Sequence, residues 1–150
     1  MRISHTLGAT ALAAIFSGAC AVIAFQGSPS TPATVWDRVY TEAQAARGRK
    51  AYLTHCGYCH KDDLTGAGDR GEPPLVGAPF MGQWDNKPLA DLFLAIGTLM
   101  PYDNPDSLFP QVVVDIVSFL LQANNVPAGE AAELPPDVRK LRQIVMTTRP

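Results

Sequence analysis

Cysteine is scarce in this chain, occurring only at positions 20, 56 and 59. Small exported domains that depend on disulfides are much richer in cysteine, so a disulfide framework is excluded. Neither sign of charge is in large excess, because the chain has 12 basic and 14 acidic residues and a net charge of −2. That balance gives no reason to expect nucleic acid as a partner. The chain also lacks internal repeats and any alternating apolar–polar run that would indicate a strand, so we expect an all-α protein.

The first 25 residues are almost free of charge. Arg2 is the single charged residue, and an apolar run extends over residues 7–25. This pattern is typical of a signal peptide, which would be cleaved after export. The run is also nearly long enough to serve as a retained membrane anchor. A third reading makes Cys20 a lipid-modified N-terminus. All three readings place the rest of the chain outside the cytoplasm, either free in the periplasm or anchored facing it.

The remainder divides by composition into a linker, one domain and a tail. Residues 26–40 begin with turn-forming residues and are predicted to be a linker. Residues 41–129 are long enough for one domain. Residues 130–150 are rich in proline and charge and form a C-terminal extension, with a short helical pattern over 137–146.

Three longer helices are predicted within the domain. The first starts near Thr41 and runs towards position 56, the second spans about 88–98, and the third ends at about Asn124. Residues 61–87 show no sustained period and carry many glycines and prolines. A structureless stretch of this length in a small domain usually surrounds a ligand.

The most specific motif is Cys56-Gly57-Tyr58-Cys59-His60. C-x-x-C-H is the attachment signature of c-type haem, in which two thiols form thioethers and the histidine ligates the iron. On a helix, positions i, i+3 and i+4 share one face, so the three side chains would point at one object. A thioredoxin-like dithiol belongs near a βαβ pattern that is absent here, and a zinc site needs further ligands. His55 is assigned to the surface or to the rim of the haem.

A second iron ligand would have to be a methionine, because no histidine follows His60. Met81, Met100 and Met146 are the candidates. Met100 is favoured because it lies in a loop between two amphipathic helices and is followed by Pro101, which restrains the backbone. Met81, or an open site occupied by water, remains an alternative. Trp84 is either a core aromatic or a donor to a haem propionate.

These features together resemble class I c-type cytochromes, over roughly residues 45–129. The resemblance implies a cytochrome c fold, with three main helices around one covalently bound haem and a long irregular loop. It also implies that the first and last helices cross at Gly48 and Tyr52, opposite Val117 and residues 119–120. Pro73 would supply the carbonyl that accepts a hydrogen bond from the proximal imidazole. The stretch from 116 to 129 is similar to bacterial cytochrome subunits that serve periplasmic dehydrogenases.

A closed His60–Met100 site would make the protein an electron carrier rather than an enzyme. Its partners would be redox proteins, with a dehydrogenase as donor and an oxidase or another cytochrome as acceptor. One alternative is an electron-transfer subunit of a larger periplasmic dehydrogenase. Another is a haem enzyme or gas sensor with an open distal site. The acidic residues concentrated between positions 56 and 125 serve either for solubility or for docking.

Overall fold

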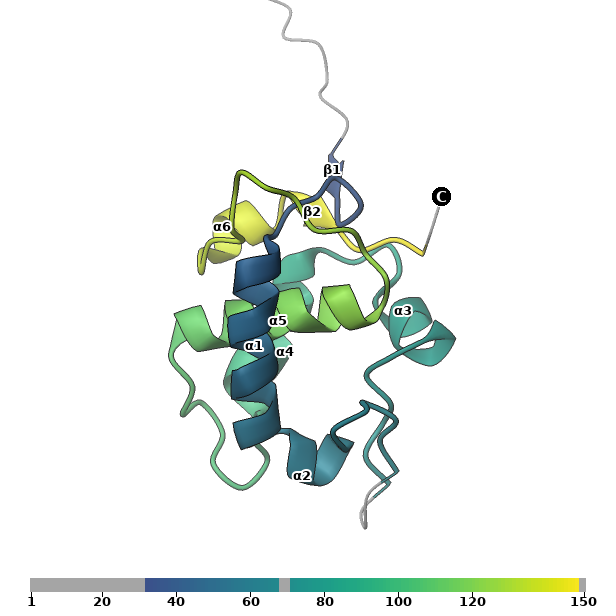
Figure 1. Cartoon of the computed structure of the whole chain (residues 1–150), viewed down its shortest axis with the longest axis vertical. Helices are drawn as coiled ribbons and strands as arrows, with labels where there is room; N and C mark the ends of the chain where they lie inside the picture. The colour runs from purple at the N-terminus through teal and green to yellow at the C-terminus, as the bar shows by residue number, and fades with distance from the viewer. Residues whose placement is uncertain (1–31, 68–70, 149–150) are drawn as a thin grey trace, which may run out of the picture. The chain divides into compact units, whose positions relative to one another are not determined.

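A computed structural model describes residues 32–67 and 71–148 of the chain (Figure 1). The elements in these residues are β1 (Ala33–Thr34), α1 (Glu42–His55), α2 (Gly57–His60), α3 (Ala78–Trp84), α4 (Leu89–Leu99), α5 (Pro110–Ala123), α6 (Val138–Leu141) and β2 (Ile144–Val145). The all-α prediction is confirmed, since the strands amount to one short pair. The three long helices α1, α4 and α5 match the three that the sequence predicts. The predicted leader lies outside the described residues, and none of the described helices has the length and apolarity to cross a bilayer.

Helix α1 crosses α5 in direct backbone contact (Figure 1). Gly48 is the contact point, because a Cβ built there would lie 1.8 Å from the carbonyl oxygen of Asp115. One turn later, the rings of Tyr52 and Phe119 pack with their centroids 5.3 Å apart. Apolar side chains of α5 then fill the interior, with Val113, Ile116, Val117 and Leu120 all buried. The crossing therefore holds the end of α1, where the C-x-x-C-H motif begins.

One helix is absent from the sequence prediction. The pattern of residues 61–87 predicts no helix, whereas α3 occupies Ala78–Trp84. With seven residues, α3 is too short to show a helical period, although Pro79 stands at its start and Phe80 and Met81 are buried. The helical pattern predicted over 137–146 is also only partly realised, because α6 ends at Leu141 and β2 follows.

The N-terminal and C-terminal segments of the described chain pack against the body. Residues 32–40 fall within the predicted linker, yet Val35 and Tyr40 have no exposed surface. Strand β1 pairs in parallel with β2, with Ala33 opposite Ile144. The Tyr40 hydroxyl also donates to the carbonyl of Val126 at 2.6 Å. These pairings join residues more than 80 positions apart, which a local composition does not reveal.

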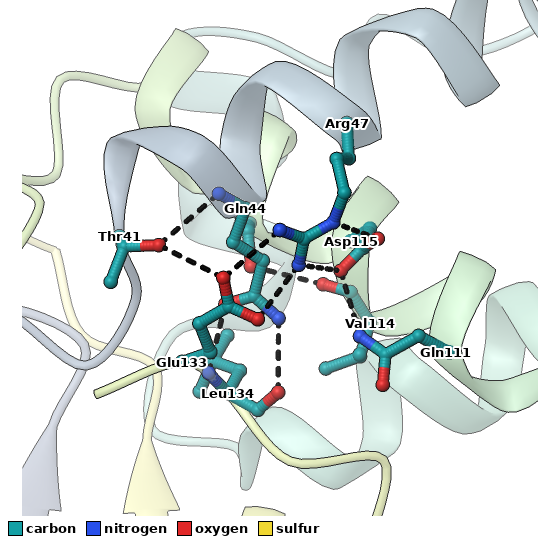
Figure 2. Close-up of polar contacts among 9 residues, drawn as sticks. Thr41, Gln44, Arg47, Gln111, Val114, Asp115, Glu133 and Leu134 are labelled. Carbon is teal, nitrogen blue, oxygen red and sulfur yellow. Dashed lines mark hydrogen bonds and ion pairs between the residues drawn. The ribbon is translucent and has the colours of Figure 1, made fainter.

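A polar network ties the C-terminal extension to the helix crossing (Figure 2). The Arg47 guanidinium donates to both carboxylate oxygens of Asp115, at 2.9 and 3.1 Å, and to both of Glu133, at 3.0 and 2.7 Å. The buried amide of Gln44 makes two further hydrogen bonds, to the backbone oxygen and nitrogen of Leu134 at 2.9 and 2.8 Å. The hydrogen bond from Arg47 lowers the pKa of Glu133. Helix α1 thus holds the extension through both charged and neutral contacts.

Glu133→Gln should reduce stability by less than about 1 kcal/mol at pH 7, because Arg47 and Glu133 are both nearly half exposed. Since the folded-state pKa is depressed, the ion pair contributes above the unfolded pKa of about 4.3. That contribution disappears as the pH falls through the folded pKa. Urea unfolding should therefore show a larger difference between variant and wild type at pH 7 than at pH 3. The exposed Glu130→Gln is the control, and an equal difference at both pH values would contradict the ion-pair account.

Candidate functional site

The C-x-x-C-H motif begins at the junction of α1 and α2. The Cys56 N–H donates to the Tyr52 carbonyl of α1 at 2.8 Å. The Cys56 carbonyl then accepts from the N–H groups of Cys59 and His60, at 3.1 and 2.9 Å. These bonds set positions 56, 59 and 60 in one turn. Both thiols are free and half-buried.

Two alternative uses of the thiols gain no support from the structure. Burial, followed by the proximity of Cys59, raises the pKa of the Cys56 thiol to about 11. A dithiol oxidoreductase instead needs a thiol with a lowered pKa. A zinc site also lacks ligands, because nowhere in residues 32–67 and 71–148 do three His, Cys, Asp or Glu side chains gather closely enough to hold a metal ion.

The His60 imidazole is buried, with 8% of the residue exposed. Its Nδ1 lies 3.1 Å from the carbonyl oxygen of Pro73, the contact that the family resemblance implies. A carbonyl only accepts, so Nδ1 carries the proton and Nε2 is left with a free lone pair. The Tyr52 hydroxyl donates to the Lys61 carbonyl at 2.6 Å and so holds the chain directly after the imidazole.

The three candidate methionines differ in their surroundings. Met146 is fully buried, and its backbone bonds both Asn86 and Lys87 at 2.8 Å. Met81 is buried in the core on α3. Met100 is partly exposed and directly follows α4, where its N–H bonds the Ile96 carbonyl at 3.1 Å. Of the three, Met100 alone lies outside the core.

The two tryptophans also differ. The indole N–H of Trp36 donates to the Thr147 carbonyl at 3.0 Å. Trp84, at the end of α3, is partly buried, and its ring lies 5.4 Å from the Lys87 ammonium. Within the described part of the chain its indole N–H has no hydrogen-bond acceptor.

Two residues that contact the segment around Pro73 do not stand out in the sequence. The sequence predicts only that a helix ends at Asn124. In the structure, its buried side chain forms hydrogen bonds with Gly77 and Leu75, in the segment that follows Pro73. In the sequence, Gly66 is one of several glycines in a predicted loop. In the structure, it lies against the Pro73 carbonyl. Both contacts join residues through the tertiary fold, and the sequence carries no local signal for them.

The set of candidate cofactor-binding groups fits a covalently bound haem. It comprises two free thiols, an imidazole with a directed lone pair and a thioether outside the core. The family described as "Cytochrome C oxidase, cbb3-type, subunit III" matches residues 43–120, a range that includes the motif and Met100. The crystal structure of the sulfane dehydrogenase SoxCD from Paracoccus pantotrophus is similar at 18% identity and a TM-score of 0.48, over 82% of this chain and 68% of that one. No curated protein matches the sequence.

Proposed function

Because the chain belongs to the cytochrome c oxidase cbb3-type subunit III family of class I c-type cytochromes, we propose that it carries single electrons on one haem c. The expected cytochrome c fold is confirmed by the family match and the helical architecture. Membership also implies the haem cofactor and a role in electron transfer. The proposal adds the ligand set: attachment through Cys56 and Cys59, with His60 and Met100 on the iron. When bound, haem c supplies a reversible ferric–ferrous couple.

The observation that carries this proposal is the orientation of His60. Its Nδ1 is taken by the Pro73 carbonyl at 3.1 Å, and its ring is buried. A histidine that ligates a metal almost always donates its other ring N–H to such an acceptor. The bond fixes the tautomer and the ring plane, so Nε2 is presented as a ligand without further rearrangement.

Met100 is the best candidate for the opposite ligand. A side chain packed in the core, as Met81 and Met146 are, would have to leave its packing to reach an iron. Met100 lies outside the core, so it could reach an iron without leaving a cavity behind. Pro101, whose φ is fixed, restrains the backbone after it. Two protein ligands would keep the site closed to substrates, which favours electron transfer over catalysis.

Trp84 would contribute to the binding of the haem periphery. Its free indole N–H is a suitable donor to an anionic propionate, and the Lys87 ammonium near its ring adds positive charge. The apolar side chains of α3 and α4 that remain only partly buried, among them Leu94 and Ile96, would be covered by the macrocycle.

We propose redox proteins as partners, a dehydrogenase as donor and an oxidase or another cytochrome as acceptor. The haem motif and the apolar leader support a periplasmic location, with residues 7–25 as cleaved signal or retained anchor. Tyr58, within the motif, is 91% exposed, and Tyr102, which follows the Met100-Pro101 pair, is 73% exposed. Such side chains would give a partner apolar contact close to the site of electron exchange.

Carbon monoxide tests whether the site is closed. Wild-type ferrous protein should bind it only through the minor state in which Met100 has dissociated, about 0.1–10% of molecules. Met100→Ala should therefore bind carbon monoxide about 10- to 1,000-fold more tightly. Absorption titration measures both affinities, and Met81→Leu is the control that should behave as wild type. Tight binding by the wild type, unchanged in Met100→Ala, would favour an open-site enzyme or sensor instead.

A further inference from the structure

Building on the proposed haem ligation, we propose that Asn124 and Gly66 are positioning residues that hold the Pro73 carbonyl against His60 and so tune the reduction potential. Pro73 itself is exposed, so core packing does not determine where its carbonyl lies. Hydrogen bonds and close contacts on both sides of Pro73 take that role.

Asn124 holds the chain on the C-terminal side of Pro73. It caps α5 and is 7% exposed. Its Oδ1 accepts from the Gly77 N–H at 2.8 Å. Its Nδ2 donates to the Leu75 carbonyl at 3.0 Å and to the Leu120 carbonyl at 2.8 Å. Both donors of the amide are thereby used, and the segment after Pro73 is held to the end of α5.

Gly66 holds the chain on the N-terminal side. Its N–H donates to the His60 carbonyl at 3.0 Å. A Cβ at this position would lie 2.6 Å from both the carbonyl carbon and oxygen of Pro73, and 2.5 Å from the Glu72 oxygen. Its φ of +66° is also a conformation that favours glycine. Only glycine allows the backbone after His60 to approach the carbonyl that His60 bonds.

The chemical consequence is a change in the basicity of the imidazole. A well-aligned Nδ1–H···O=C bond raises the donor strength of the opposite nitrogen. A stronger donor favours the ferric state, so it lowers the potential. If the Pro73 carbonyl moves away from His60, the bond weakens and the potential rises.

The first test compares Asn124→Ala with Gln44→Ala in the haem-loaded protein. Gln44→Ala is a matched control, because it removes two buried amide-to-backbone bonds to Leu134 of the C-terminal extension, and neither bond involves the segment around Pro73. Both variants should lose thermal stability. Only Asn124→Ala should shift the ferric–ferrous equilibrium, by about three- to tenfold towards ferrous, where tenfold is about 59 mV. Exchange of the His60 Nδ1 proton with solvent, followed by NMR, should accelerate about tenfold or more in the same variant.

The second test uses a pair of glycines with similar positive φ values. Gly71 has φ +72°, and no atom of the described residues lies within 4 Å of a Cβ built there. Gly66→Ala and Gly71→Ala therefore impose similar backbone strain, but only the first displaces the Pro73 carbonyl. We expect a raised potential and faster Nδ1 exchange in Gly66→Ala alone.

The outcomes separate this inference from the proposed function. Iron-shifted NMR signals of the His60 ring in the wild type establish ligation, and their absence would overturn both proposals before any variant is compared. If His60 ligates the iron but Asn124→Ala matches Gln44→Ala in potential and in exchange, the positioning role is wrong. Equal effects of Gly66→Ala and Gly71→Ala would reject the role of Gly66 in the same way.

Discussion

The double variant Cys56→Ala, Cys59→Ala is expected to carry no covalently attached haem at all. The two thiols are the sole attachment points that the motif offers, and they lie in one turn at the junction of α1 and α2. Without attachment, the partly buried apolar side chains of α3 and α4 lose the group that would cover them. We therefore expect loss of cooperative thermal unfolding as well as loss of the haem.

Intact mass and denaturing gels stained for haem measure the attachment, and circular dichroism follows the unfolding. Cys20→Ala is the matched control, because it removes the third cysteine without touching the motif, and it should retain the haem in full. Each single variant, Cys56→Ala or Cys59→Ala, should retain at most one thioether bond. Covalent haem in the double variant would refute the assignment of the attachment site.

Gly48→Ala is expected to destabilise the protein by about 3 kcal/mol, the upper end of the usual range for overpacking. The added Cβ would lie 1.8 Å from the Asp115 carbonyl oxygen and 2.4 Å from its carbon. Both are backbone atoms of α5, so no side-chain rotation relieves the overlap and the two helices must separate. Separation would also disturb the packing of Tyr52 against Phe119.

The matched control for Gly48→Ala is Gly97→Ala in α4. A Cβ there meets only the Val113 methyl groups, at ordinary contact distances of 3.8 and 3.9 Å. Because alanine is the better helix former, Gly97→Ala should be neutral or stabilising by up to about 1 kcal/mol. Chemical unfolding of the haem-loaded proteins measures both changes. Similar stabilities for the two variants would contradict the close crossing of α1 and α5.

The long helices were predictable because their signals are local. Periodic apolar positions mark α4 and α5, and Gly48 within an otherwise helical stretch already indicates close approach by another element. Helix α3 was missed because seven residues carry no readable period. The pairing of residues 33–34 with the C-terminal extension was missed because its contacts, such as Ala33 with Ile144, join distant parts of the chain.

The residues of the candidate site also divide into those with a local sequence signal and those whose contacts arise only in the folded chain. Cys56, Cys59 and His60 are predicted from a sequence motif, and Met100 is proposed from its place between two helices. Pro73 was expected only from resemblance to a family. Asn124 and Gly66 act through hydrogen bonds and close contact with the segment around Pro73, and their neighbours are known only once the chain is folded.

The most direct test of the account is an NMR spectrum of the reduced, haem-loaded protein with its methionine methyl groups labelled. A methyl group held over a haem is shifted far upfield by the ring current of the macrocycle. We predict one such signal, which disappears in Met100→Leu and persists in Met81→Leu and Met146→Leu. Disappearance of the signal in Met81→Leu instead, or the absence of any upfield methyl in the wild type, would contradict a closed His60–Met100 electron-transfer site.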